Sequence, residues 1–213
     1  METIALPSGI RVLPIVAGHL ALDFANTVDD PLGPQRHDHI AGYPALLAWS
    51  ARIGTLPPDA ASALVETGAR QPGRAAEVVS RAAALRDAMN GTFGAIVEDP
   101  AGAGGPWAEL RPFIATAIAR ADLPPPAASW DLTDLEAPLW PVAEAAYRLL
   151  ISPDLARLKR CVGCPWLFLD KSKNASRRWC SMEFCGTDRK KQRYVAKRAA
   201  GRRAARTAGP PGG

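Results

Sequence analysis

Apolar residues recur at helical spacing through most of the first 156 residues of the chain. The longest such stretch, residues 74–97, predicts a helix with one face toward a core, although Gly91 and Gly94 are candidate breaks within it. Such stripes are typical of core faces and not of cofactor sites. The stripe consists of Val78, Leu85, Met89, Phe93 and Ile96.

Proline at first-turn positions and glycine beyond helix ends divide the remaining helical pattern into pieces. Residues 10–28 begin as a strand pattern and then become helical, with Leu20, Phe24 and Val28 spaced four apart. We therefore expect residues 1–156 to form a mainly α domain that includes a short β element. The other predicted helices span residues 44–53, 58–69, 107–121 and 141–150.

A glycine-rich segment at residues 101–106 has the composition of a phosphate-binding loop but lacks its context. No strand pattern precedes the segment, and no Lys-Ser or Lys-Thr pair follows it, so the phosphate-loop motifs do not apply. The segment is predicted to be a flexible connector.

Polar residues interrupt the apolar pattern at two places in the N-terminal half. Asp23 and Asn26 lie three residues apart in a predicted helix and therefore share one face. The default interpretation is a local polar pair on the first helix, and the alternative is a pair that faces a ligand or forms hydrogen bonds inside the core. His37 and His39 have no third metal ligand nearby, so the sequence predicts a solvated loop there.

All four cysteines of the chain lie close together near the C-terminus. Cys161 and Cys164 can face one ion from a tight turn, and Cys180 with Cys185 can complete a tetrahedron. We expect Zn²⁺ bound by four sulfurs, in a closed site whose role is structural. An iron–sulfur cluster, disulfides or free thiols are the alternatives.

The cysteines define a small module that is predicted to span residues 157–206. Ser152, Pro153 and Asp154 carry the start signals of a helix that reaches Cys161 without a Gly/Ser linker, so the module is expected to dock on the helical domain. A treble-clef-like order of cysteine turn, β-hairpin and helix is expected. The predicted pieces are strands at 165–170 and 177–179, a turn at 171–176, a helix from about residue 188 to 200 with Thr187 or Asp188 as its cap, and a disordered tail at 207–213.

Charge separates the two parts of the chain. Residues 157–206 contain 16 Lys/Arg and 3 Asp/Glu, a net charge of +13, whereas residues 1–156 contain 10 and 18, a net charge of −8. Because a merely soluble helix usually mixes signs, this excess predicts a polyanionic partner, with duplex DNA first. The candidate contact residues are Lys171, Lys173, Arg177, Arg178, Arg189, Lys190, Lys191, Arg193, Lys197, Arg198, Arg202 and Arg203.

Several classes of protein are disfavoured by the pattern. Residues 11–22 are not a signal peptide, because no basic segment precedes them and His19 interrupts the apolar run. No window reaches the about 18 apolar residues of a membrane span, so a cytoplasmic, nucleoid-associated protein is expected. No catalytic Ser/His/Asp or Cys/His arrangement is present, and a fully ligated zinc activates no water, so no enzymatic activity is expected.

Residues 164–186 resemble the CGNR zinc finger family over a long and specific stretch. Residues 20–27 and 46–49 resemble the ABATE domain, which precedes that finger in bacterial proteins regarded as stress-induced transcription regulators. The resemblance implies a mainly helical, sensor-like domain followed by a DNA-binding finger that is ligated by the four cysteines. After the glycine of the family signature, Thr187 and Asp188 replace Asn-Arg, so a DNA contact of that arginine would move to Arg189 or be lost.

The leading hypothesis is a DNA-binding transcription regulator whose helical domain senses a small-molecule effector or forms a homodimer. One alternative is an RNA-binding module, for which Trp166, Phe168 and Trp179 would supply stacking surfaces. Another is a protein-interaction module that responds to thiol oxidation by releasing zinc.

Overall fold

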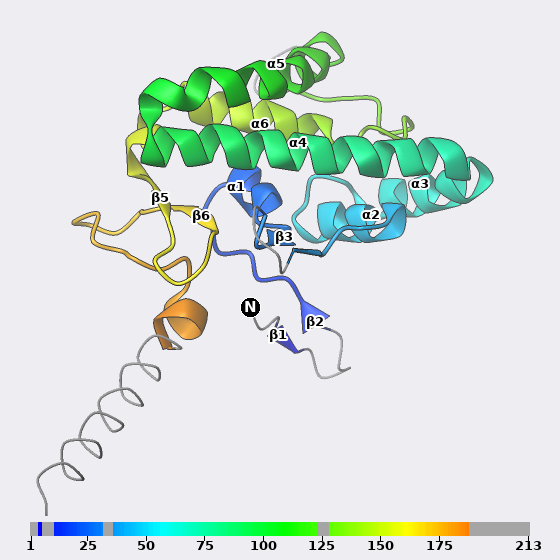
Figure 1. The fold of residues 1–213 in the computed structure, drawn as a ribbon. Helices are drawn as coiled ribbons and strands as arrows, with labels where there is room; N and C mark the ends of the chain where they lie inside the picture. Colours follow the sequence, from blue (N-terminus) through cyan, green and yellow to red (C-terminus); the bar gives the residue numbers. More distant parts are fainter. Residues whose placement is uncertain (1–3, 6–10, 32–35, 123–127, 188–213) are drawn as a thin grey trace, which may run out of the picture.

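The computed structural model describes residues 4–5, 11–31, 36–122 and 128–187, and helices dominate this part of the chain. In Figure 1 the long helix α4 lies at the centre, with α5 and α6 along one side of it and α1 on the other. Helices α2 and α3 lie at the end of α4 opposite the strands β5 and β6. The helices are α1 Leu20–Ala25, α2 Tyr43–Arg52, α3 Pro58–Arg70, α4 Pro72–Glu98, α5 Gly104–Ala119 and α6 Trp140–Leu150.

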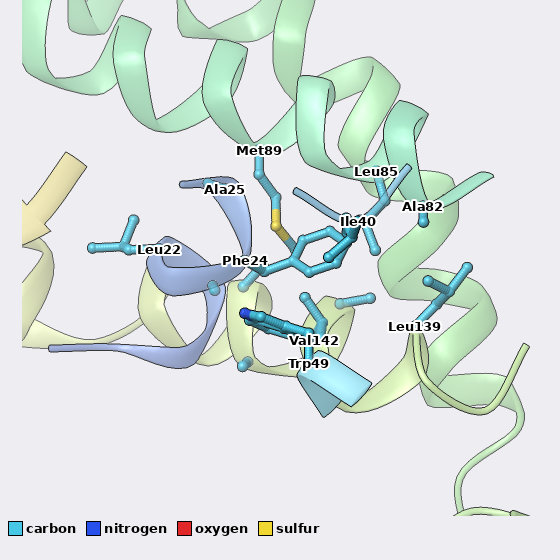
Figure 2. Close-up of a cluster of buried hydrophobic side chains, with 14 of the residues drawn as sticks. Leu22, Phe24, Ala25, Ile40, Trp49, Ala82, Leu85, Met89, Leu139 and Val142 are labelled. Carbon is cyan, nitrogen blue, oxygen red and sulfur yellow. The ribbon is translucent and has the colours of Figure 1, made fainter. Parts of the chain in front are cut away.

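The core forms where α1, α2, α4 and α6 meet. The ring of Phe24 packs edge-on against Trp49, with 5.4 Å between the ring centroids. Figure 2 shows Phe24 between the Met89 side chain and Trp49, with Val142 below. All four side chains are buried, so the helical stripes predicted from the sequence do form one core.

Helix α4 continues through Gly91 and Gly94, and the expectation of a break there is wrong. Neighbouring segments approach the helix closely at both glycines. A Cβ atom at position 94 would lie 2.5 Å from a guanidinium nitrogen of Arg160, and one at position 91 would lie 3.2 Å from Cβ of Pro106. The two glycines therefore allow close packing, and the surrounding contacts offset their low helix propensity.

The described strands form three antiparallel pairs of two strands each. In the first domain Val28 pairs with Asp38, so Val28 is not helical and the predicted solvated loop at residue 37 is a short strand. The pair near the cysteines places Leu158 opposite Leu169. The pairs are β1 Ile4–Ala5 with β2 Arg11–Val12, β3 Val28–Asp29 with β4 His37–Asp38, and β5 Leu158–Arg160 with β6 Leu167–Leu169.

Two connecting segments differ from the prediction. The expected flexible connector at residues 101–106 is wrong, because η1 (Pro100–Ala103) and the first turn of α5 occupy it. The helix expected after Ser152 is also wrong beyond one short 3₁₀ helix, η2 (Pro153–Arg157). The Ser152 hydroxyl does accept a hydrogen bond from the Asp154 amide, at 3.0 Å, but the chain then enters β5, whose backbone groups pair with β6.

No helix in the described ranges combines the length and the apolar character that a membrane crossing requires.

Candidate metal centre and basic module

The four cysteine sulfurs lie together in one cluster. All four Sγ atoms are within 4.8 Å of one another, and the Cys164–Cys180 and Cys180–Cys185 separations are 3.6 and 3.7 Å. A tetrahedral ion with Zn–S bonds of about 2.3 Å requires sulfurs about 3.8 Å apart, and a disulfide requires about 2.05 Å. The cluster therefore fits one zinc ion, and the four cysteines are not paired as disulfides.

The turn between β5 and β6 positions the first two sulfurs. The Cys161 amide donates to the Trp166 carbonyl at 2.8 Å, and the Gly163 amide donates to the Cys161 sulfur at 3.3 Å. Position 163 must be glycine because a Cβ atom there would lie 2.9 Å from the Cβ of Cys185. The backbone thus places an N–H dipole on a sulfur that has to carry negative charge in a zinc site.

Without a cation the four thiols do not all ionise, because hydrogen bonds among the sulfurs lower the pKa of Cys161 and Cys185 and raise the pKa of Cys164 and Cys180. Hydrogen bonding to Cys161 and to the other sulfurs, followed by burial, raises the pKa of the Cys164 thiol. A divalent ion with four sulfur ligands removes this penalty, because thiolates bind it directly. A site in which all four ligands come from the protein is closed, so the ion can supply folding energy but has no open position for a substrate.

The second pair of sulfurs follows a different path from the one predicted. Residues 177–179 form no strand, so the predicted return strand is wrong and the hairpin of the module is β5–β6. Cys185 lies in η3 (Met182–Gly186), a helical turn that begins about six residues before the predicted helix start at residue 188. The Ser181 hydroxyl caps this turn by accepting from the Glu183 amide at 3.2 Å.

Asp170 explains why the chain loops where a strand was expected. Its buried carboxylate accepts from Lys159 Nζ at 2.7 Å, from the Arg177 amide at 2.8 Å and from the Ser172 amide at 3.0 Å. Burial by itself raises the pKa of Asp170, but these donors outweigh burial and lower it. The carboxylate therefore gathers both ends of the 171–176 loop around one buried negative charge.

Three of the predicted basic contact residues lie exposed on or next to this loop. Lys171, Lys173 and Arg178 form no ion pair with any residue that the structure describes, and Arg178 lies over the Trp179 ring at 5.6 Å. The other basic candidates, together with the predicted helix to residue 200 and the tail at 207–213, lie outside the described residues. These candidates are Arg189, Lys190, Lys191, Arg193, Lys197, Arg198, Arg202 and Arg203.

Arg177 has a structural role that the sequence did not indicate. Its guanidinium donates to the carbonyls of Trp179 at 2.8 Å and Val16 at 2.9 Å, also contacts the Cys180 carbonyl, and lies 4.6 Å from the centre of the Phe168 ring. These contacts join the segment that carries a zinc ligand to the N-terminal domain. Because the charge is engaged in this way, Arg177 is not available as a phosphate contact in the present arrangement.

Two of the three aromatic residues proposed as stacking surfaces are inside the protein. Trp166 is 2% exposed and donates its indole N–H to the Val28 carbonyl at 3.1 Å, and Phe168 is fully buried. The prediction that these two rings stack on RNA bases is therefore wrong. Trp179 is only half-buried.

Asp23 and Asn26 form hydrogen bonds inside the core. Both oxygen and nitrogen of the Asn26 carboxamide bond to the backbone of Leu167 in β6, at 3.0 and 2.8 Å, so the side chain pairs with the strand as another strand would. The Asp23 carboxylate accepts from the amides of Val16 and Ala17 at 3.0 and 2.9 Å. These contacts correspond to the core interpretation and give the ligand-facing one no support.

The module is docked on the helical domain, as predicted. In addition to the Asn26 and Trp166 bonds, the Leu169 amide donates to the Ala17 carbonyl at 2.8 Å, and Arg160 pairs with Glu98 at the end of α4. The buried side chains of the module and of the helices belong to one continuous core. The zinc module and the helical domain therefore share one interior.

The Asp23→Asn variant is expected to be more stable than the wild-type protein at neutral pH. Burial raises the pKa of Asp23 from 3.8 to about 6, because the hydrogen bonds from Ala17 and Val16 offset only part of the desolvation. A raised pKa means that the folded state holds the proton more tightly, so stability falls as the pH rises from about 4 to about 6. The difference corresponds to at most about 3 kcal/mol.

Urea denaturation of both proteins between pH 4 and pH 7 tests this expectation. The wild type should lose stability relative to Asp23→Asn across that interval, because asparagine keeps an acceptor for the two amides but carries no charge. A constant difference between the two proteins over the whole pH range would contradict the assignment.

Two family models match the chain, one over the helical domain and one over the zinc module. Residues 18–153 match the ABATE family, described as "Putative stress-induced transcription regulator", and residues 157–198 match the CGNR zinc finger. No curated protein matches the chain. Both resemblances found in the sequence are confirmed, and the zinc finger match assigns Zn²⁺ to the four-cysteine cluster. The chain therefore belongs to the ABATE family and carries a CGNR zinc finger after its helical domain.

Proposed function

We propose that the protein regulates transcription by binding duplex DNA through the zinc module. The observation that carries the proposal is the exposed positive side of the 171–178 loop, where Lys171, Lys173 and Arg178 have no described acidic partner. Figure 1 places the loop between β6 and η3 at the end of the molecule away from α2 and α3. Side chains of this kind bind phosphates without reading bases, so they would set affinity and orientation on DNA.

The zinc ion has a structural and not a catalytic role in this proposal. It would fix the β5–β6 turn and η3 relative to each other, and Asp170 would fix the loop between them. A rigid basic surface loses little conformational entropy when it binds, which favours affinity. Fully ligated zinc has no open coordination position, so we propose no enzymatic activity.

Neutralising the loop is expected to weaken DNA binding and to reduce its salt dependence. In the triple variant Lys171→Ala/Lys173→Ala/Arg178→Ala, each lost phosphate contact should lower the slope of log affinity against log salt by about 0.9, and three lost contacts should lower it by about 2.7. Fluorescence anisotropy with a labelled duplex at several salt concentrations measures the slope directly.

A matched control removes three exposed charges from the helical domain with Arg70→Ala/Arg74→Ala/Arg111→Ala. This variant has the same net charge as the loop variant and should bind DNA with the wild-type slope. Equal slopes for the loop variant and the control would show that the loop does not contact phosphates. Absence of any affinity for duplex DNA at low salt would remove the proposal altogether.

A DNA-binding regulator of this kind would act in the cytoplasm, at the nucleoid. Its helical domain would bind a small-molecule effector or join two copies of the chain into a homodimer. Competition between duplex DNA and single-stranded RNA tests the RNA-binding alternative, which predicts a higher affinity for the RNA.

Mild peroxide treatment followed by a zinc-release assay tests the redox alternative, which predicts that oxidation of the thiols releases the zinc ion.

A further inference from the structure

A recess of about 410 Å³ lies between α2, α3 and the first turns of α4, remote from the zinc module. Its walls come from the segment that leads into α2, from one face of α3 and from the start of α4. Nearly all of the lining residues are alanine, glycine, proline or valine, and none carries a charge. The lining includes Gly42, Tyr43, Gly68, Ala76 and Val79.

The recess is formed by rigid parts of the fold. The Tyr43 hydroxyl donates to the Leu135 carbonyl at 2.9 Å, which fixes the ring on one wall. A Cβ atom at position 68 would lie 2.7 Å from that ring, so glycine lets α3 pack directly against it. Burial raises the pKa of the Tyr43 hydroxyl above its usual value, so the side chain is neutral. A preformed site of this kind costs little reorganisation when it is filled.

The size and chemistry of the recess identify the class of occupant. Small-molecule sites have volumes of about 300–1,000 Å³ and mostly apolar linings, which includes this recess. A stable protein partner would instead need a face of about 800 Å² on each side. Because no lining side chain is charged and the Tyr43 hydroxyl already has its partner, a charged ligand would lose hydration without compensation.

We propose that this recess binds a small, neutral, largely apolar molecule, and that the occupied recess influences the zinc module. The binding step stands independently, whereas the influence on DNA affinity rests on the proposed function. Such a ligand would be an aromatic or aliphatic compound without a carboxylate, phosphate or ammonium group.

Hydrogen bonds connect two of the segments that line the recess to the zinc module. The wall at residues 41–44 follows β4, and Asp38 of β4 forms a pair of 2.7 Å hydrogen bonds with Arg86 of α4, the helix whose start forms another wall. Strand β4 pairs with β3, and the Val28 carbonyl of β3 accepts the Trp166 indole N–H beside the cysteine turn. A shift of the α2 entrance relative to α4 would therefore act on the contact that supports the zinc turn.

The neutral fluorophore N-phenyl-1-naphthylamine is a suitable probe, because its emission rises in apolar sites. Titration into the full-length zinc-loaded protein should give saturable binding at one site per chain. Ala76→Trp is expected to weaken probe binding about tenfold or more, because the exposed alanine lies on the lining and the indole would fill the space. Ala84→Trp makes the same change at an exposed position of α4 outside the lining and should bind as the wild type does.

The proposal is overturned if the probe does not saturate, or if Ala76→Trp and Ala84→Trp bind it equally. It is also overturned if sedimentation shows a wild-type dimer that Ala76→Trp alone converts to monomers, since the recess would then be an interface between two copies. Thermal unfolding of both variants checks that neither result reflects loss of the fold.

Regulation is tested separately by measuring duplex affinity with and without saturating probe. A change in affinity for the wild type and for Ala84→Trp, but not for Ala76→Trp, supports coupling between the recess and the zinc module. If DNA binds normally and the probe saturates without changing the affinity, the coupling is wrong. If the probe saturates and no DNA binds, the proposed function is wrong and the binding site stands.

Discussion

Replacing Cys180 by serine is expected to release zinc and to unfold the module between β5 and η3. The Cys180 sulfur is fully buried and lies within 3.7 Å of the sulfurs of both Cys164 and Cys185, so a weak hydroxyl ligand there leaves the ion with three thiolates. Structural zinc in small fingers supplies on the order of 10 kcal/mol of folding free energy. Zinc content by mass spectrometry and amide hydrogen exchange measure the two effects.

The exchange pattern should separate the module from the helices. Amides of β5, β6 and η3 are expected to lose protection, while the central part of α4 keeps it, because Phe24, Met89 and Val142 pack with one another between the helices and are not zinc ligands. Ser181→Ala changes the next residue and removes a cap worth about 1 kcal/mol, so it should keep one zinc ion per chain. Full zinc content in Cys180→Ser would show that Cys180 is not a ligand.

Asp38→Ala is expected to lower the free energy of unfolding by about 3–5 kcal/mol, because it leaves the Arg86 charge without its partner inside the protein. Arg86 is 1% exposed and donates both Nη atoms to Asp38 at 2.7 Å; among the residues that the structure describes, its only further side-chain acceptor is Thr27, at 3.4 Å. Urea denaturation at neutral pH measures the free energy of unfolding. Loss of the ion pair removes a link between α4 and the β3–β4 strand pair.

Two further variants show whether the cost arises from an unpaired buried charge. The double variant Asp38→Ala/Arg86→Met removes both charges and should recover much of the stability, as replacement of buried pairs by apolar residues usually does. Arg36→Ala breaks the exposed pair with Asp87 and should cost at most about 1 kcal/mol. A double variant no more stable than Asp38→Ala would contradict the explanation.

The same ion pair gives a defined pH dependence. Burial by itself raises the pKa of Asp38, but hydrogen bonds from Arg86 and from the Ile40 amide outweigh burial and lower it below 3.8. A lowered pKa contributes stability that is present above about pH 4 and lost as the pH falls through the folded-state value. The gap in stability between the wild type and Asp38→Ala should therefore narrow under acid conditions.

Features encoded by neighbouring residues could be predicted from the sequence. The helices α2, α3 and α6 begin and end within about one residue of their predicted bounds, because proline, glycine and the apolar stripe act locally. The four-cysteine cluster was predictable for a similar reason, since the spacing of thiolates in the chain limits how they can surround one ion.

Features that depend on distant partners were missed. Asn26 and Leu167 are 141 residues apart, and no local pattern indicates that a carboxamide will pair with a strand backbone. The role of Arg177 is likewise hidden, because a basic residue in a basic run gives no sign that its guanidinium will bond to the Val16 carbonyl. The predicted return strand failed because Asp170 draws the chain into a loop.

By itself, the sequence determined the mainly helical first domain, the zinc ligands and the excess of positive charge near the C-terminus. Only the tertiary structure decided which charges remain exposed, which polar pair enters the core, and where an apolar recess remains between helices. The reason is physical: periodicity and ligand spacing act over a few residues, whereas burial and hydrogen bonding of a side chain depend on segments that folding alone brings together.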